Sequence, residues 1–216
     1  MWDKRLVAIK KGKRLGTTLL AHSFKPDFAA VRLLLEKVTR PITNKTNVAG
    51  RIYFFIEKTD FFTAPASTRF HGDYEGGLVE HSMKVYEILV EKVKNSSKKI
   101  EVSDDTLKIV ALLHDVCKAN FYKIDYRNAK NALGVWEKVP YYTVEDTIPY
   151  GHGEKSVMMI TEYMKLTSEE KYAIRWHMGF TEPKEQYGTI GIAYTKYPLA
   201  LLVFESDLEA TYFFDT

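Results

Sequence analysis

A histidine and an aspartate stand side by side directly after an apolar run, and this stretch constrains the fold more than any other. The run IVALL (109–113) leads straight into His114 and Asp115. Burying an imidazole and a carboxylate beside such a run costs free energy unless both groups have partners. A divalent metal suits both, because neutral imidazole and ionised carboxylate are common metal ligands. A plain structural pair is the alternative, and the positions of the other histidines favour the metal.

Length and composition indicate an ordinary globular chain. Its 216 residues fit one domain and suffice to bury a full core. The formal net charge is +3, with basic residues clustered at 10–14, which allows a phosphate-bearing substrate without demanding one. A single cysteine, Cys117, excludes an internal disulfide and a thiolate metal cage. No apolar run reaches the length of a membrane span, and the first residues do not resemble a signal peptide. We therefore expect a cytoplasmic protein without a membrane partner.

Apolar residues recur at helical spacing along most of the chain, which predicts a mainly α-helical fold. Between about 121 and 150 the pattern changes to alternating aromatic and β-branched residues, which predicts a small β-hairpin inserted between helices. We expect residues 1–60 to form an arm and helices packed on a core domain at 61–216. The expected helices cover residues 27–39, 49–60, 78–95, a segment capped by Ser103 that carries the His-Asp pair, a segment opened by GHGE (151–154), 168–177 with Gly179 as a stop, and 198–212.

Further histidines and an aspartate lie where burial is expected. His81, His152 and His177 lie on or at the ends of predicted helices, each beside apolar neighbours. Asp207 interrupts a helix that is otherwise apolar. One buried histidine is usually satisfied by a backbone carbonyl, but several on separate helices would each need a separate partner. A shared metal site would satisfy them together, and spacing alone leaves open whether these side chains converge.

The ordered set of these residues resembles the metal-ligand series of the HD-domain superfamily of metal-dependent phosphohydrolases. GGLVEHS (76–82) resembles the first histidine motif of that superfamily, and LLHDVCK (112–118) resembles its His-Asp motif with a trailing lysine. GHGE (151–154) and RWHMG (175–179) resemble the two later histidine motifs. The match covers about residues 61–212. It implies an HD-domain helical bundle that carries the hairpin as an insertion.

The resemblance also favours a dinuclear metal centre. Four positions match the ligands of single-metal members. Two further histidines match the extra ligands of two-metal members, in which the aspartate of the His-Asp pair bridges the ions. Trp176 stands where some relatives have another histidine, which leaves a seventh ligand open, and the sequence does not distinguish among Mn, Fe, Co, Ni, Zn and Mg. The implied ligands are His81, His114, Asp115 and Asp207 for one ion, with Asp115, His152 and His177 for a second.

Hydrolysis by metal-activated water is the chemistry that the resemblance implies. A bound metal lowers the pKa of its water to about 7 and polarises a phosphoryl oxygen. Asp115 would be central to this chemistry as the bridging ligand. Lys118 lies one helical turn past His114 and would contact a phosphate, with an exposed helix lysine as the alternative.

Other polar residues near the motifs are candidates for supporting roles. Asp73 and Glu75 would orient water or protonate a leaving oxygen, with turn-forming acids as the alternative. Arg69 and His71 would line the substrate entrance. Glu154 would hold a hydrogen bond to a ligand histidine.

Several functions remain open at this point. The first is a phosphohydrolase that acts on a nucleotide or another phosphate ester, with the hairpin and the pair Phe61 and Phe62 offering surface for base stacking. A close variant is a 3′–5′ exonuclease of the HD type, for which nucleic acid would be a partner. HD-fold di-iron oxygenases have the same ligand order. A ligand-sensing domain without turnover is the non-enzymatic alternative, and the intact ligand set argues against it. A homo-oligomer is compatible with each of these functions.

Overall fold

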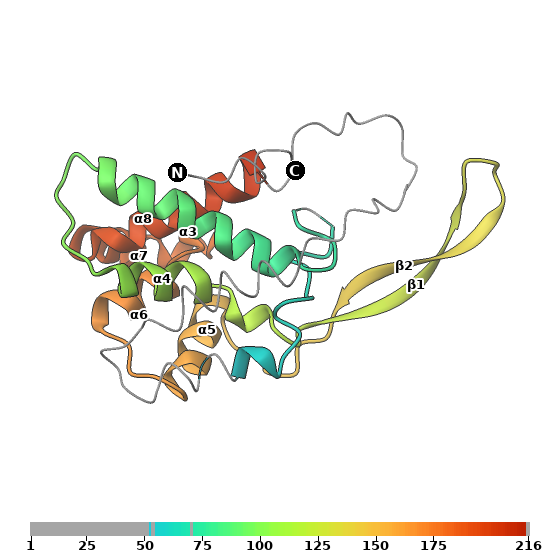
Figure 1. The fold of residues 1–216 in the computed structure, drawn as a ribbon, viewed down its shortest axis with the longest axis horizontal. Helices are drawn as coiled ribbons and strands as arrows, with labels where there is room; N and C mark the ends of the chain where they lie inside the picture. Colours follow the sequence, from blue (N-terminus) through green and yellow to red (C-terminus); the bar gives the residue numbers. More distant parts are fainter. Residues whose placement is uncertain (1–51, 53–54, 70, 215–216) are drawn as a thin grey trace, which may run out of the picture.

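Six α-helices form the body of the molecule in the computed structural model, which describes residues 52, 55–69 and 71–214 (Figure 1). A two-stranded hairpin projects from this body, so the predicted mainly α fold with a small hairpin is confirmed. The predicted helix at 27–39 and the basic cluster at 10–14 lie outside the described residues, as do 49–51, 53 and 54 of the predicted helix at 49–60, of which residues 52 and 55–57 are helical. The elements are α3 (Gly77–Asn95), α4 (Asp104–Leu113), β1 (Tyr122–Lys130), β2 (Trp136–Val144), α5 (His152–Thr161), α6 (Ser168–Arg175), α7 (Tyr187–Lys196) and α8 (Pro198–Glu209).

Two glycines set the entry into α3. Gly76 has a φ of 88°, in the left-handed region that favours glycine. A Cβ on Gly77 would lie against the carbonyl oxygen of Gly72, far inside van der Waals contact. The amide of Leu78 donates a hydrogen bond of 3.0 Å to the carbonyl of Ala64. The loop before α3 is therefore held tightly against the first turn of the helix, as the paired glycines predicted.

The helices bury one continuous apolar core. α3 packs against α4 and α8, and α6 packs against α4, α5 and α8. None of the helices in the described part of the chain is long and apolar enough to cross a membrane. The largest fully buried side chains of this core are Phe61, Ile52, Ile56, Leu78, Leu89, Ile109, Leu112, Leu113, Ile160, Ile174 and Ile190.

Side-chain caps fix the starts of α4 and α6 and join them. Ser103 caps α4 as predicted, and its hydroxyl accepts a hydrogen bond of 3.1 Å from the amide of Thr106. Thr167 and Glu170 form a reciprocal capping box at the start of α6. The hydroxyl of Thr106 also donates to the Glu170 carboxylate at 3.1 Å. This bond fixes the relative positions of the two helices whose far ends carry predicted ligands.

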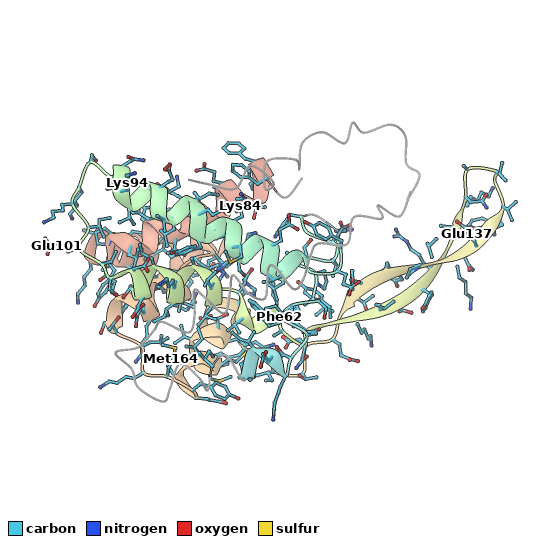
Figure 2. The ribbon with its side chains drawn as sticks, viewed as in Figure 1. Phe62, Lys84, Lys94, Glu101, Glu137 and Met164 are labelled. Carbon is cyan, nitrogen blue, oxygen red and sulfur yellow. The ribbon has the colours of Figure 1, made fainter. Side chains whose placement is uncertain are left out.

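The hairpin consists of two antiparallel strands of nine residues each. Its turn includes Gly134, which has a φ of 76°. Most of its side chains are exposed, and Glu137 lies near the tip, far from the helical body (Figure 2). An isolated two-stranded hairpin is only marginally stable in water. Packing among the described residues therefore does not explain why the hairpin carries apolar side chains that face solvent.

The chain leaves the helix at the His-Asp pair, where the sequence predicted that the helix continues. α4 ends at Leu113, Asp115 has φ −105° and ψ 17°, and a 3₁₀ turn follows at Val116–Lys118. Consecutive side chains of a regular α-helix are about 100° apart. Leaving the helix allows His114 and Asp115 to face the same cluster.

The predicted helix at 168–177 is two residues too long. α6 ends at Arg175, and Trp176 has a φ of −106°. His177 therefore follows the helix instead of ending it. Gly179 has a φ of 51°, which agrees with its predicted role as a stop.

Helix α7 was not predicted. It contains Gly188 and Gly191, which lower its helix propensity. Only Ile190, Ala193 and Tyr194 are buried, so its apolar stripe is short. Packing against α8 stabilises this helix more than its own sequence does.

Candidate metal centre

The carboxylate of Asp115 lies at the centre of a group of histidines. Its Oδ1 lies 2.6 Å from Nε2 of His152 and 3.4 Å from Nε2 of His177. Its Oδ2 lies 3.5 Å from Nε2 of His114 and 3.9 Å from Nε2 of His81. The two oxygens of one carboxylate therefore face two different pairs of histidines.

Asp207 of α8 also belongs to this group, and its nearest partner is His81 of α3. Its Oδ1 lies 3.0 Å from Nε2 of His81 and 3.9 Å from Nε2 of His114. Burial alone would raise the pKa of Asp207, but the hydrogen bond of His81 and the charges of His81, His114 and His177 lower it. The apolar helix α8 can therefore carry this carboxylate, because imidazoles from other segments of the chain surround it.

Backbone carbonyls orient two of the imidazole rings. Nδ1 of His114 lies 2.7 Å from the carbonyl oxygen of Ala111, and Nδ1 of His177 lies 2.6 Å from that of Ile174. Each Nδ1–H donates to its carbonyl, so Nε2 is the nitrogen that could bind a metal. Both Nε2 atoms are buried and have no hydrogen-bond partner among the residues that the structure describes. A buried acceptor without a partner is costly, and a second hydrogen bond at Nδ1 is typical of metal-ligating histidines.

His152 lies at the more open side of the group and contacts the only cysteine. Its side chain is 30 % exposed, whereas that of His177 is fully buried. Nδ1 of His152 lies 3.3 Å from Sγ of Cys117. Burial would lower the pKa of His152, but the charge and hydrogen bond of Asp115 outweigh it and raise that pKa to about 9. The contact with Cys117 had no signal in the sequence, which predicted only a small buried thiol.

Lys118 is buried against Asp115, so the alternative of an exposed helix lysine is wrong. Its Nζ lies 2.7 Å from Oδ2 of Asp115, and its side chain is 13 % exposed. Burial would raise the pKa of Asp115, but the charges of Lys118, His114 and His152 hold it well below its usual range. The pKa of Lys118 is raised in turn, because the attraction of Asp115 outweighs the effect of burial. A fixed positive charge therefore lies beside the group.

A close backbone approach brings His152 and His177 together. A Cβ on Gly153 would lie against the carbonyl oxygen of Arg175, far inside van der Waals contact. Glycine at this position lets the start of α5 lie directly against the end of α6. The ring centroids of His152 and His177 are consequently 5.2 Å apart.

Glu154 pairs with Arg175, so the prediction that it holds a ligand histidine is wrong. The ion pair joins the first turn of α5 to the last turn of α6. A second carboxylate, that of Glu182, lies 2.7 Å from the same guanidinium. Arg175 also stacks on Trp176, with its guanidinium carbon 3.8 Å from the ring centroid. This network supports the positions of His152 and His177 from outside the cluster.

The loop before α3 carries the residues predicted to line the entrance. The ring of His71 lies next to that of His81, with centroids 5.4 Å apart. Ser67 stabilises the loop, because its hydroxyl donates a hydrogen bond of 2.8 Å to the carbonyl of His71. Arg69 and Asp73 are exposed on the same loop. Their roles at the entrance remain predictions.

Phe61 and Phe62 are core residues, so their predicted role in base stacking is wrong. Phe61 is fully buried and Phe62 is 5 % exposed. Their rings contact each other edge to face, with centroids 5.9 Å apart. Their segment is irregular, as predicted, but its aromatic side chains point inward.

The donors of the cluster fit a divalent metal. Donor atoms that bind one ion at about 2.1 Å lie about 3–3.4 Å from one another. Most of the separations around Asp115 and Asp207 are 3.0–3.9 Å. Three overlapping groups have their donor atoms within 4.8 Å of one another: His81, His114 and Asp115; His114, His177 and Asp207; and Asp115, Cys117 and His152.

A recess of about 160 Å³ opens beside His152 and Lys118. Lys155 is a second buried lysine in its wall, with Nζ 2.6 Å from Oδ1 of Asp146. The recess therefore offers two ammonium groups next to the candidate metal centre. Its remaining lining residues are Cys117, Phe121 and Tyr150.

The chain belongs to the HD domain family, which matches residues 78–210. The match covers more than half of the chain and includes all six predicted ligands. Domains of this family bind divalent metals, and the His and Asp groups described above could hold them.

A curated protein gives a shorter match. It is the dihydroneopterin 2′,3′-cyclic phosphate phosphodiesterase of Methanocaldococcus jannaschii, 41 % identical over 61 residues. The matched segment is 27 % of this chain and 24 % of that relative, so the similarity spans about a quarter of each protein. No solved structure matches the chain.

Proposed function

We propose that this chain hydrolyses a nucleotide or another phosphate ester at a centre of two metal ions around Asp115. The observation that supports two ions is that Oδ1 of Asp115 faces His152 and His177 while Oδ2 faces His81 and His114. When a carboxylate bridges two ions, each of its oxygens binds one ion, so the two oxygens must face different sets of ligands. Bound metal would supply an activated water and polarise the phosphoryl oxygen.

The chain's own residues would hold and complete this centre. His114 and His177 would present Nε2 to a metal, because backbone carbonyls hold their Nδ1 atoms. Asp207 adds a carboxylate whose lowered pKa keeps it ionised. Lys118 offers an ammonium group beside Oδ2 of Asp115, where it would hydrogen-bond a phosphoryl oxygen and stabilise its charge.

Substrate would enter past the loop that carries His71. We assign contacts with substrate to Arg69 and His71, and the orientation of water or a leaving oxygen to Asp73. The recess beside His152 would take the phosphate, because Lys118 and Lys155 both lie in its wall. The name of the archaeal relative specifies a cyclic phosphodiester of a small molecule, which supports a phosphodiester substrate for this chain.

Metal analysis followed by a hydrolysis screen tests the proposal. The protein is purified without chelator and its metals are measured by elemental analysis. Nucleotides and cyclic phosphodiesters are then offered with Mn²⁺, Co²⁺, Fe²⁺ or Mg²⁺, and phosphate or phosphomonoester release is followed. We expect about two ions per chain and metal-dependent release. Bound iron that consumes O₂ with an organic substrate, without phosphate release, would contradict the proposal and favour an oxygenase.

Replacing Lys118 separates substrate binding from metal binding. We expect Lys118→Gln to raise KM by roughly tenfold or more, because a charge-assisted hydrogen bond to the phosphate is lost. Metal content should not fall, because the change removes a positive charge next to the ions. Lys108→Gln is the matched control, since the side chain of Lys108 is buried to a similar degree and pairs with Asp104 within α4, away from the cluster. Loss of metal with an unchanged KM would instead make Lys118 a support for Asp115.

A further inference from the structure

The two faces of the projecting hairpin differ in composition. Directly paired residues of antiparallel strands point to the same face, so the register sorts the side chains into two sets. One set, here called the aromatic face, contains two lysines and no acid. The other set contains two acids, Asp125 and Glu137. The aromatic face consists of Tyr122, Ile124, Tyr126, Asn128, Lys130, Trp136, Lys138, Pro140, Tyr142 and Val144.

The outer part of the aromatic face is open to solvent. More than half of the surface of Ile124, Tyr126 and Trp136 is exposed. The ammonium of Lys130 lies over the ring of Trp136, 5.2 Å from its centroid. Singly exposed apolar residues are common, but a row of them along one face marks a binding surface.

The hydrogen-bond pattern brings the side chains of this face close together. The amide of Glu145 donates to the carbonyl of Phe121 at 2.8 Å, and the amide of Asn131 donates to that of Val135 at 2.9 Å. Hydrogen-bonded and non-hydrogen-bonded pairs alternate along an antiparallel ladder. Every pair of the aromatic face is therefore non-hydrogen-bonded, which is the arrangement with the closest side chains.

The inner end of the aromatic face reaches the candidate metal centre. The hydroxyl of Tyr122 donates to the carbonyl of Ala66 at 3.2 Å, in the loop that leads to His71. Tyr122 also lies close enough to Lys118 to interact with its charge. The hairpin thus runs without a break from its projecting tip to the helical body (Figure 1), and its residue Tyr122 lies beside the candidate metal centre.

We propose that the aromatic face binds single-stranded nucleic acid, and that this polymer is the substrate whose phosphodiester bonds are hydrolysed at the metal centre. The inference rests on the function proposed above and specifies its substrate. Strands of nine residues extend about 30 Å, which a mononucleotide cannot span. Bases stack on Tyr126, Trp136 and Tyr142, while Lys130 and Lys138 contact backbone phosphates. Stacking of this kind tolerates any sequence, since every base has a π face.

Charge and backbone chemistry favour this occupant over a second copy of the chain. The acids of the strands lie on the other face, so Lys130 and Lys138 are the only charged side chains that the strands place on the aromatic face. Pro140 belongs to a non-hydrogen-bonded pair, so its nitrogen lies on the outer edge of β2. That nitrogen has no proton to donate, which hinders another strand from adding to this edge. Acids approach this face at its inner end, where the charges of Glu75, Asp73 and Asp60 act on Tyr142.

Fluorescence anisotropy with labelled oligonucleotides tests the inference. The probes are fluorescein-labelled 20-mers of single-stranded DNA and RNA, titrated with the full chain in EDTA so that they stay intact. We expect Tyr126→Ala/Trp136→Ala to weaken binding by roughly tenfold or more. Val139→Ala/Tyr141→Ala is the matched control, because both residues lie on the opposite face. It should bind both probes like the unchanged chain.

Three outcomes would overturn the inference. The unchanged chain binds neither 20-mer, or the aromatic-face variant binds as tightly as the control. In the third outcome, sedimentation finds a dimer that only the aromatic-face variant dissociates, without oligonucleotide binding, which makes the face an interface between copies. Hydrolysis of bis(p-nitrophenyl) phosphate by the unchanged chain with Mn²⁺ is measured separately. Turnover of this small ester without oligonucleotide binding leaves the proposed hydrolase standing and removes only the polymer.

Discussion

Replacing Asp115 with asparagine is expected to remove bound metal and to lower turnover by more than about 10²-fold. The reason is geometric, because both oxygens of this carboxylate face imidazole nitrogens, 2.6 Å from His152 on one side and 3.5 Å from His114 on the other. An amide offers one neutral oxygen and cannot bridge two ions. Loss of a group that only supports a ligand costs about 10–100-fold, and loss of the shared ligand should cost more. Elemental analysis and kcat on a released phosphate ester measure the two effects.

A second variant separates loss of the centre from loss of the fold. Asp115→Asn leaves the buried ammonium of Lys118 without its carboxylate, which should destabilise the protein by about 3 kcal/mol or more. Asp115→Asn/Lys118→Met removes both charges, so its unfolding temperature should recover. Neither variant should retain metal or turnover. A folded single variant with full metal content and normal kcat would exclude Asp115 as a ligand.

Local sequence patterns predicted most of the helices and the hairpin. The apolar stripe of α3, the cap at Ser103 and the alternation at 121–150 are local signals. Each is formed by residues that are close to one another in the sequence. Gly76 and Gly77 likewise predicted a tight helix entry, because only glycine tolerates such a φ and such an approach. Features that depend on neighbouring residues can be inferred from sequence for this reason.

The geometry of the candidate centre depends on contacts between distant segments. Motif order indicated which side chains belong together, but neither the contact of Cys117 with His152 nor the pair of Glu154 with Arg175 follows from spacing. The prediction for Phe61 was wrong for the same reason, since an irregular segment without helical or strand periodicity gave no sign that its rings point inward. Tertiary packing decides these positions, and it overrides local pattern.

Gly153→Ala should disturb the centre without changing any ligand. A methyl group at this position would lie against the carbonyl oxygen of Arg175, which is backbone and cannot move aside. Overpacking of this kind costs about 1–3 kcal/mol. The start of α5 should shift away from the end of α6, which separates His152 from His177 and weakens binding of the second ion. Thermal unfolding and metal stoichiometry check both effects.

Gly191→Ala is the control for this change. Gly191 also lies in a helix, but an added Cβ there meets nothing within 4 Å. Alanine should therefore stabilise α7 by about 0.5–1 kcal/mol and leave metal content unchanged. If Gly153→Ala behaved like this control, the close approach of α5 and α6 would not govern the spacing of the two histidines. The second ion would then depend on Asp115 and its bond to His152 alone.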